Sequence, residues 1–296
     1  MLALIDCDIV AYRTAFSCQK TLPDGNIQLE PESIAIVRFN EMIEQILSDT
    51  GATEYQLWLS DKTQNNFRLQ FYPEYKANRK NLVPPVYLNL LKEFAINNWG
   101  AQITCNQEAD DALGIHQCDL MNNPDRADDS SIICSIDKDL KQIPGNHFNF
   151  VTKEKSFVTP EEGLRAFYTQ LLVGDTSDHI QGAVGIGSAK AKKGLGGLYD
   201  EKSLFYAIRN LYQWAYSSRI FKHESLTEKE IQFVDQQILQ NGRCLKIRTR
   251  EDEVWEFPNF LKSTPTEISE QSSIPPMQVE ISQSMEPGSS TGVAQN

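Results

Sequence analysis

Residues 2–8 read LALIDCD, a short apolar run that ends in aspartates. A continuous apolar run of this length is typical of a strand buried on both faces, as in a parallel sheet. The same arrangement returns at residues 55–61, which read YQLWLSD, and at residues 131–139, which read SIICSIDKD. Because functional sites in parallel sheets form at the carboxyl ends of strands, the repetition predicts a group of carboxylates at one edge of a sheet.

The segments between these runs have the spacing of helices. In residues 33–47 apolar side chains recur at three- and four-residue intervals, which is typical of a helix with one buried face. Residues 82–99 and 108–121 are also expected to be helices, with another strand between them at 101–105. Strands that alternate with helices predict an α/β fold with a mostly parallel central sheet and helices on both faces.

The pattern changes after residue 158. Thr159-Pro160-Glu161-Glu162 predicts a helix start, with threonine as N-cap, and that helix is expected to end near residue 173. Residues 201–216 and 227–240 also have helical spacing. We therefore expect an α/β core over 1–158 and a helical region over 159–261. Residues 262–296 contain eight serines, four prolines and no aromatic residue, which predicts a disordered tail.

Composition restricts the kind of site. The 296 residues include 28 Lys and Arg against 40 Asp and Glu, and a net charge of −12 by itself argues against a nucleic-acid partner. The six cysteines and four histidines are scattered, without the spacing of a zinc site or a disulfide framework. No apolar run approaches the roughly 20 residues of a membrane span, and Asp6 interrupts the first one before a signal peptide could form. We expect a cytoplasmic protein whose chemistry depends on carboxylates.

Ten carboxylates follow the expected strands or open the helices after them. Each of these carboxylates, taken alone, can be explained as a turn residue or a helix-capping residue. Together they would repel one another unless divalent cations such as Mg²⁺ or Mn²⁺ bound between them. The candidate metal ligands are Asp6, Asp8, Asp61, Glu108, Asp110, Asp111, Asp137, Asp139, Asp175 and Asp178.

Two further stretches point to phosphate. Residues 62–92 carry a net charge of +5 and include four aromatic residues before residue 76, a combination that suits a nucleic-acid strand and also suits a solvated helix face. Residues 182–193 read GAVGIGSAKAKK, which fits neither a P-loop nor a dinucleotide-binding fingerprint. A glycine turn that opens a lysine-bearing helix can still present amides to a duplex phosphate, although an ordinary turn remains the alternative.

Five motifs, in this order, resemble the 5′-nuclease or flap-endonuclease superfamily. They are ALIDCD at 3–8, PEYKANRK at 73–80, EADDALG at 108–114, SIDKDLKQI at 135–143 and GDTSDHIQGAVGIGSAKAKK at 174–193. The similarity is strongest to bacteriophage 5′→3′ exonucleases and to the 5′-nuclease domain of bacterial polymerase I, and it covers roughly residues 1–215. It implies a PIN-like nuclease core, a helical arch near residues 62–92 and a helix–two-turn–helix element at about 174–195.

The resemblance also implies roles for individual residues. A first metal cluster would be formed or supported by Asp6, Asp61, Glu108, Asp110 and Asp111, and a second by Asp137, Asp139, Asp175 and Asp178. Relatives commonly have Asp-Gly after the first strand, where this chain has Asp6-Cys7-Asp8, and Asp8 is an additional outer ligand in this interpretation. The residues implied to contact the scissile phosphate or the DNA are Lys76, Arg79, Arg68, Tyr75, Lys190, Lys192 and Lys193. The carbonyl groups of Val184 and Ile186 are implied to hold K⁺.

The activity implied is that of a Mg²⁺-dependent 5′→3′ exonuclease with flap-endonuclease activity, in which Mn²⁺ can replace Mg²⁺ and two or more ions bind. The substrate would be double-stranded DNA with 5′ ends, nicks or flaps, including RNA-primed ends, cut by a monomer in primer removal, recombination or repair. For a viral protein the compartment would be the host cytoplasm. Two alternatives stay open: a phosphatase that uses Asp6 as a nucleophile, and a DNA-binding protein that has lost catalysis.

Overall fold

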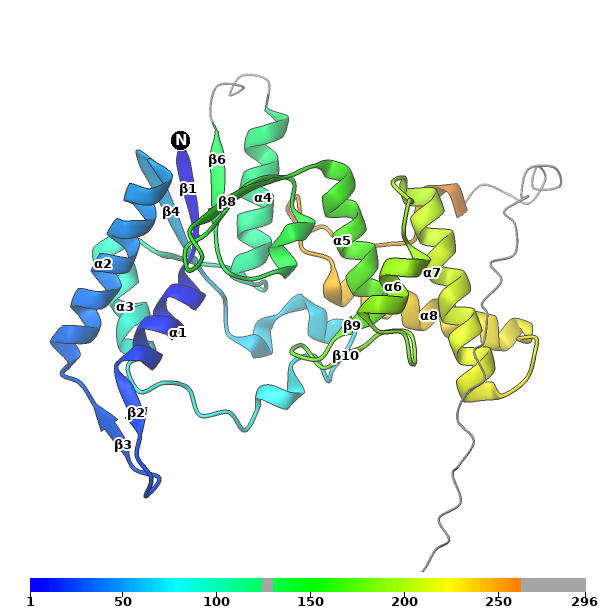
Figure 1. Ribbon diagram of the computed structural model, residues 1–296, viewed down its shortest axis with the longest axis horizontal. Coiled ribbons are helices and arrows are strands. Elements are labelled where there is room, and N and C mark those ends of the chain that lie inside the picture. Colours follow the sequence, from blue (N-terminus) through cyan, green and yellow to red (C-terminus); the bar gives the residue numbers. More distant parts are fainter. Residues whose placement is uncertain (124–129, 262–296) are drawn as a thin grey trace, which may run out of the picture. The chain divides into compact units, whose positions relative to one another are not determined.

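The computed structural model describes residues 1–123 and 130–261 (Figure 1). Residues Met1–Pro258 form one compact unit, and residues 259–261 begin a second, with a one-turn 3-10 helix η7 (Asn259–Leu261). The tail that the sequence predicts to be disordered, residues 262–296, lies outside the described residues. No helix among residues 1–123 and 130–261 is long and apolar enough to cross a membrane.

A six-stranded sheet forms the centre of the first unit. Its strand order is β5 (Gln102–Ile103), β4 (Glu54–Leu59), β1 (Leu2–Asp6), β6 (Ser131–Cys134), β7 (Gly145–Asn149) and β8 (Glu154–Val158). All neighbouring strands are parallel except β7 and β8. In the register of the sheet, Ile5 on β1 lies opposite Leu57 on one side and Cys134 on the other. The prediction of a mostly parallel sheet is confirmed.

Helices cover both faces of this sheet, which explains why β1 is apolar from Leu2 to Ile5. Ala3 and Ile5 belong to the hydrophobic core under α1 (Cys7–Ser17), α2 (Glu32–Thr50) and α3 (Leu88–Trp99). Leu4, between them in sequence, belongs to the core under α4 (Ala109–Asn122) on the opposite face (Figure 1). Since successive side chains of a strand point to opposite faces, a strand covered on both sides has no polar position.

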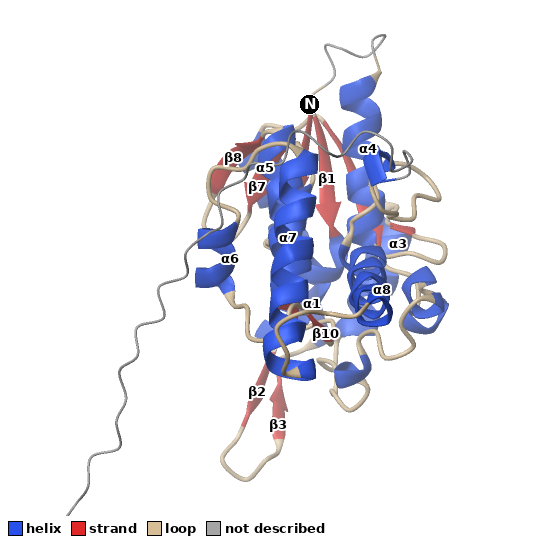
Figure 2. Cartoon of the chain, turned by 90° about the vertical axis from the view of Figure 1, so that its right-hand side faces the viewer, coloured by secondary structure: helices blue, strands red, loops and turns tan. Residues whose placement is uncertain are grey.

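Two hairpins were not predicted. Strands β7 and β8 pair in antiparallel fashion at one edge of the sheet. A second hairpin, β2 (Gln19–Thr21) with β3 (Ile27–Leu29), projects from the body of the unit (Figure 2). The sequence GNHFN of β7 does not alternate between apolar and polar residues. Its strand conformation therefore depends on neighbouring elements and not on a local pattern.

The basic segment 62–92 differs from the long helices expected of an arch. It contains the one-turn 3-10 helices η1 (Thr63–Asn65), η2 (Phe67–Gln70) and η3 (Ala77–Arg79), and α3 begins only at Leu88. Pro84 and Pro85 account for the late start of α3, because a proline disfavours helical conformation in the residue before it and donates no backbone hydrogen bond.

The helical region follows the prediction closely. Helix α5 (Pro160–Val173) starts with a capping box between Thr159 and Glu162. It packs against α6 (Ser188–Gly194), α7 (Glu201–Tyr216) and α8 (Glu228–Leu245), as Figure 2 shows from the helical side. Between α5 and α6 lies a short hairpin whose strands, β9 (Gly174–Asp175) and β10 (Ile180–Gln181), have two residues each.

Two glycines allow backbone segments to come into close contact, one at the start of this hairpin and one between α5 and the turn that contains Gln142. Gly174 has φ of +80°, and a Cβ atom there would lie 2.2 Å from the backbone nitrogen of Gly182. In α5, a Cβ atom on Gly163 would lie 2.5 Å from the carbonyl oxygen of Gln142. Helix α5 therefore packs directly against η5 (Asp139–Gln142), the 3-10 turn that follows strand β6.

Candidate metal centre and nucleic-acid interface

Asp6 lies at the carboxyl end of β1, where it also caps α1. Its Oδ1 accepts a hydrogen bond from the Ile9 nitrogen at 3.2 Å, and its Oδ2 accepts one from the Ser135 hydroxyl at 2.8 Å. Only 2% of the residue is exposed. Burial, reinforced by the charges of Asp8 and Asp137, raises the pKa of Asp6 from 3.8 to about 7. This carboxylate has acidic neighbours and no cation strong enough to neutralise it.

Asp110 occupies the first turn of α4 and faces the same acidic neighbours. Burial raises its pKa well above the usual value, and the charges of Asp6, Asp137 and Glu108 raise it further. Lys76 opposes these effects without reversing them. The amino end of α4 therefore brings a second uncompensated carboxylate to the end of β1.

Asp137 and Asp139 follow β6 and complete this group. The backbone nitrogen of Asp139 donates to Asp137 Oδ1 at 2.8 Å, and the Asp137 nitrogen donates to the Ser135 hydroxyl at 3.0 Å. Burial, then Asp137, then a hydrogen bond with Asp175 raise the pKa of Asp139 to about 7. We call Asp6, Asp110, Asp137 and Asp139 the acidic cluster.

Asp175 extends the acidic cluster toward the helical region. It is 5% exposed and accepts hydrogen bonds from the nitrogen and hydroxyl of Ser177 at 2.7 and 2.6 Å. Gln170 of α5 donates to its other oxygen at 3.2 Å. Burial opposes its ionisation, but the hydrogen bonds from Ser177 and Asp139 outweigh burial and lower its pKa.

Lys76 and Arg79 lie among the remaining carboxylates. The Lys76 ammonium donates to Glu108 and lies 3.7 Å from Asp178 Oδ1, while Arg79 donates to the same Asp178 oxygen at 2.8 Å. The Tyr75 hydroxyl is 3.1 Å from Glu108 Oε2 and 3.0 Å from Asp178 Oδ2. Burial opposes ionisation of Glu108, but Lys76 and Arg68 outweigh it and lower its pKa. The two implied phosphate contacts thus lie beside the carboxylates.

Two predicted ligands have protein partners of their own. Asp8 accepts from the Lys92 ammonium at 2.5 Å and from the Ser60 nitrogen at 2.7 Å. Asp61 accepts from the Asn106 nitrogen at 3.0 Å and from the Lys62 nitrogen at 2.7 Å, and these backbone hydrogen bonds lower its pKa. Asp8 lies in the first turn of α1, just after β1, and Asp61 follows β4 by two residues.

Arg68, Tyr75 and Asp111 are placed differently from expectation. Arg68 is 2% exposed and forms a bidentate salt bridge with Asp111, which has no exposed surface. Tyr75 is 3% exposed. A guanidinium enclosed in this way has almost no surface to offer a DNA strand, so its burial does not support the DNA contact implied for Arg68, which stays a prediction.

The lysines of the expected helix–two-turn–helix element are exposed, as a DNA contact requires. Lys190, Lys192 and Lys193 lie on α6, and the Lys190 ammonium donates to the Gly185 carbonyl at 3.2 Å. The turn before α6 contains Val184 and Ile186 and closes with a hydrogen bond from the Ile186 nitrogen to the Ala183 carbonyl at 2.9 Å. The assignment of K⁺ to its carbonyl groups stays a prediction.

Sequence reasoning missed the residues that hold these carboxylates in place. Ser135 connects Asp6 with the backbone of Asp137, and Gln170 and Ser177 fix Asp175. Exposed Arg219 packs against Gly185, where an added Cβ atom would lie 2.5 Å from its guanidinium carbon. Ser135 and Ser177 stand inside the quoted motifs, whereas nothing in the local sequence marks Gln170 or Arg219.

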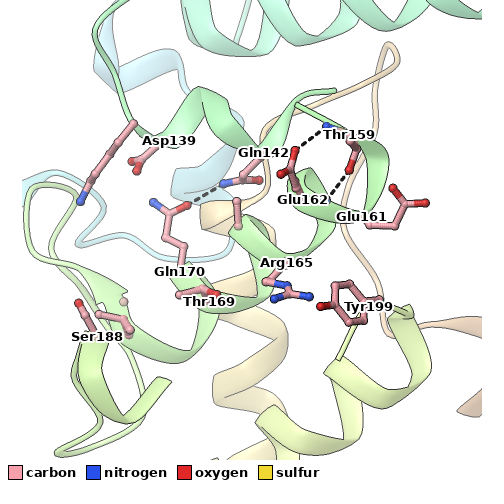
Figure 3. A pocket seen from close by; sticks show the side chains of 14 residues that line it. Asp139, Gln142, Thr159, Glu161, Glu162, Arg165, Thr169, Gln170, Ser188 and Tyr199 are labelled. Atoms are coloured by element: carbon pink, nitrogen blue, oxygen red, sulfur yellow. Dashed lines mark hydrogen bonds between the residues drawn. The ribbon is translucent and has the colours of Figure 1, made fainter. Parts of the chain in front are cut away.

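A pocket of about 970 Å³ opens beside the acidic cluster. Asp139 lies at one end of it, and Arg165 and Tyr199 lie at the other (Figure 3). Gln142 and Gln170 are joined across its floor by a hydrogen bond of 2.7 Å. Residues of α5 and Ser188, the first residue of α6, also line the pocket.

The donor set suits a hard divalent cation. Its atoms are carboxylate oxygens, the ligands that Mg²⁺ and Mn²⁺ prefer, and burial, reinforced by the charges of neighbouring carboxylates, raises the pKa values of Asp6, Asp110 and Asp139. Among the residues that the structure describes, no three acidic, histidine or cysteine side chains already converge as a metal-ligand set. Binding would therefore draw the carboxylates of the acidic cluster inward.

Known proteins are similar to this chain in sequence and in fold. The chain is 29% identical over 214 residues to DNA polymerase I of Bacillus caldotenax, covering 65% of this chain and 23% of that protein. It is 28% identical over 199 residues to the 5′-3′ exonuclease of Buchnera aphidicola subsp. Schizaphis graminum, covering 62% of this chain and 66% of that one. The chain therefore spans less than a quarter of the polymerase and about two thirds of the exonuclease.

The T5 D15 protein, crystallised with metal ions, has the same fold. It superimposes with a TM-score of 0.52 at 16% identity, over 82% of this chain and 92% of that chain. The family described as "5′-3′ exonuclease, N-terminal resolvase-like domain" matches residues 1–168. These residues are more than half of the chain and include the acidic cluster, so the protein belongs to this family of the 5′-nuclease superfamily.

Proposed function

We propose that the protein is a Mg²⁺-dependent 5′→3′ exonuclease that also cuts flaps, and that it leaves 5′-phosphates. The observation that carries this proposal is the acidic cluster, in which burial and mutual repulsion raise the pKa values of Asp6, Asp110 and Asp139. A protein gains nothing structurally from uncompensated buried carboxylates, so their presence supports a cation site.

The relatives support the same activity. Besides the Buchnera exonuclease, a flap endonuclease Xni of a Shewanella strain is 29% identical over 166 residues. The bacteriophage T5 D15 flap endonuclease, solved with DNA and metal ions, shares the fold with a TM-score of 0.50 at 15% identity. We accordingly propose DNA with 5′ ends, nicks or flaps as the substrate, including RNA-primed ends.

The acidic cluster and Asp175 would hold two or more Mg²⁺ ions, with Glu108 and Asp178 at the edge beside Lys76. When bound, Mg²⁺ lowers the pKa of water and offsets phosphate charge, and Mn²⁺ can replace it. A water oxygen attacks the phosphorus, the bond to the 3′ oxygen breaks, and the 3′ oxygen takes a proton. The products are a 5′-phosphate and a 3′-hydroxyl.

Lys76 and Arg79 would bind the scissile phosphate. Both cations contact Asp178, so when a phosphate binds there, each cation would exchange its carboxylate partner for a phosphoryl oxygen. Fixed cations at this position stabilise the charge that develops on the phosphoryl oxygens in the transition state. The backbone of Lys76 has the left-handed conformation, with φ of 56°, and its backbone nitrogen donates to the Asp178 carbonyl at 3.0 Å.

The duplex would lie across α6, where Lys190, Lys192 and Lys193 are exposed to its phosphates. The carbonyl groups of Val184 and Ile186 would hold K⁺ in the turn before α6. We propose that the protein acts as a monomer in the cytoplasm, or the host cytoplasm for a viral protein. The proposed pathway is primer removal during replication, with recombination or repair as further settings.

A cleavage assay tests this proposal. DNA labelled at the 5′ end is offered as a flap, a nicked duplex and a blunt duplex, with Mg²⁺ or with EDTA. We expect Mg²⁺-dependent products that carry 5′-phosphates, and an Asp137→Asn variant that binds DNA without cutting it. Asp235→Asn, which alters the ion pair of Asp235 with Arg209 between α7 and α8, is the matched control and should cut normally. Cleavage in EDTA, or normal cleavage by Asp137→Asn, would contradict the proposal.

A further inference from the structure

Arg68 and Asp111 form a salt bridge that is closed to solvent. The two guanidinium nitrogens donate to the two carboxylate oxygens at 2.6 and 2.8 Å. Their side chains are 3% and 0% exposed. Both residues stand among other charged residues in the sequence, Arg68 in the basic segment and Asp111 beside Asp110, and both are buried.

The acceptor capacity of Asp111 is already filled. An ionised carboxylate has about four lone-pair sites. Asp111 Oδ1 accepts from Arg68 and from the Arg248 nitrogen at 3.1 Å, and Oδ2 accepts from Arg68 and from the Glu108 nitrogen at 3.1 Å. A metal ion could bind Asp111 only by breaking one of these four hydrogen bonds in a buried site, where an unpaired donor is costly.

The remaining donors of Arg68 hold a distant part of the chain. Its Nε donates to the Cys244 carbonyl at 2.7 Å, and a terminal nitrogen donates to the Lys246 carbonyl at 3.0 Å. The Phe67 ring lies 4.6 Å from the Arg68 guanidinium and 3.8 Å from that of Arg248. Residues 244–248, at and just after the end of α8, are therefore fastened to the first turn of α4.

These contacts join three segments at one point beside the acidic cluster. Glu108 and Asp110 belong to the turn that Asp111 caps, so a fixed Asp111 also fixes the positions of their side chains. Partners that orient metal ligands without touching the ion commonly matter 10- to 100-fold for metal affinity. The fastened segment 244–248 lies outside residues 1–168, the part that the family description matches.

We propose that Arg68 and Asp111 are positioning residues that fix Glu108 and Asp110 against residues 244–248 and contact neither metal nor DNA. The inference rests on the proposed function, because the ligands that they position are those of the proposed metal site. It assigns a structural part in that site to the end of α8. It also separates Asp111 from Asp110, which sits beside it in the sequence.

Metal binding tests the part of the proposal that concerns Asp111. The full chain and its Asp111→Asn and Asp110→Asn variants are titrated with Mn²⁺ by calorimetry, without DNA, and their melting temperatures are recorded. We expect Asp111→Asn to bind the same number of ions 10- to 100-fold more weakly, with kcat largely restored at saturating Mn²⁺. Asp110→Asn should lose an ion or all cleavage. A folded Asp111→Asn variant that binds one ion fewer would overturn the inference.

DNA binding tests the part that concerns Arg68. The Kd for a flap duplex is measured in Ca²⁺ at several salt concentrations for Arg68→Met and, as a control, Lys192→Ala. We expect Arg68→Met to retain the salt dependence of the unaltered chain. Lys192→Ala should reduce the slope by about 0.9, the value for one lost phosphate contact. A similar reduction for a folded Arg68→Met variant would show a phosphate contact and overturn the inference.

If substitutions of Arg68 or Asp111 unfold the protein, a milder variant tests the same proposal. Phe67→Leu removes the ring between the two guanidinium groups and leaves every charge in place. We expect it to fold and to bind Mn²⁺ several-fold more weakly with an unchanged DNA salt slope. Unchanged Mn²⁺ affinity in a folded Phe67→Leu variant would overturn the inference. An unaltered chain that binds no divalent cation would overturn the proposed function as well.

Discussion

Asp6→Asn replaces the most buried member of the acidic cluster by a neutral group of the same shape. Burial and the charges of Asp8 and Asp137 raise the pKa of Asp6 from 3.8 to about 7. Since one pKa unit corresponds to about 1.36 kcal/mol, the ionised carboxylate costs the metal-free fold about 4 kcal/mol. The amide of the variant can still accept a hydrogen bond from the Ile9 nitrogen and cap α1. The hydrogen bonds of an amide are weaker than those of a carboxylate, which offsets about 1 kcal/mol of the stability that the variant gains.

The sign of this effect depends on pH. Because the folded-state pKa is the higher one, the folded protein binds more protons than the unfolded chain between pH 3.8 and about 7. The cost is absent below this window, grows through it and is complete above it. The metal-free Asp6→Asn variant should therefore be more stable than the unaltered chain by about 3 kcal/mol at pH 8 and by less than about 1 kcal/mol at pH 5.

Urea unfolding in EDTA at both pH values measures this difference. Adding Mg²⁺ at 100 times its Kd should then stabilise the unaltered chain by about 2.7 kcal/mol and have little effect on the variant. Asp235→Asn, which weakens an ion pair with Arg209, is the control and should lose stability in both buffers. A variant that is no more stable than the unaltered chain at pH 8, or equally stabilised at pH 5 and pH 8, would refute the reasoning.

Three further predictions concern cleavage and binding. Lys76→Met should lower kcat about 10²- to 10³-fold in a flap-cleavage assay and leave DNA binding in Ca²⁺ within a few-fold; an unchanged kcat would exclude a phosphate contact. Because burial, Asp137 and Asp175 raise the pKa of Asp139 to about 7, protons compete with metal there, and calorimetry should show Mn²⁺ affinity rising between pH 6 and 8; a flat profile would contradict this. Replacing Lys190, Lys192 and Lys193 by alanine should reduce the salt slope of DNA binding by about 2.7 while single-turnover cleavage at saturating protein stays unchanged.

Local patterns predicted much of the fold. The apolar runs that end in aspartate became β1, β4 and β6, and the capping box at Thr159 became the start of α5. These features depend on side chains a few residues apart, which the sequence displays directly. The hairpin of β7 and β8 was missed because each strand takes its stability from its partner and not from its own pattern.

The net charge of −12 averages over unlike regions of the chain. Residues 62–92 carry a net +5, yet Arg68 in that segment is buried and Lys76 is paired with Glu108. The implied DNA contacts Lys190, Lys192 and Lys193 lie exposed on α6, and their contact with DNA stays a prediction. Whether a charge faces solvent is decided by elements that pack from elsewhere in the chain.

The sequence by itself determined that carboxylates gather where parallel strands end, because strand period and turn chemistry are local properties. Only the tertiary structure decided which carboxylates stay unpaired. Asp110 and Asp111 are chemically identical neighbours, but successive helical residues point about 100° apart. One therefore faces Asp6 and Asp137, while the other meets Arg68, 43 residues earlier in the chain. That difference comes from the packing of three distant segments, which no local pattern contains.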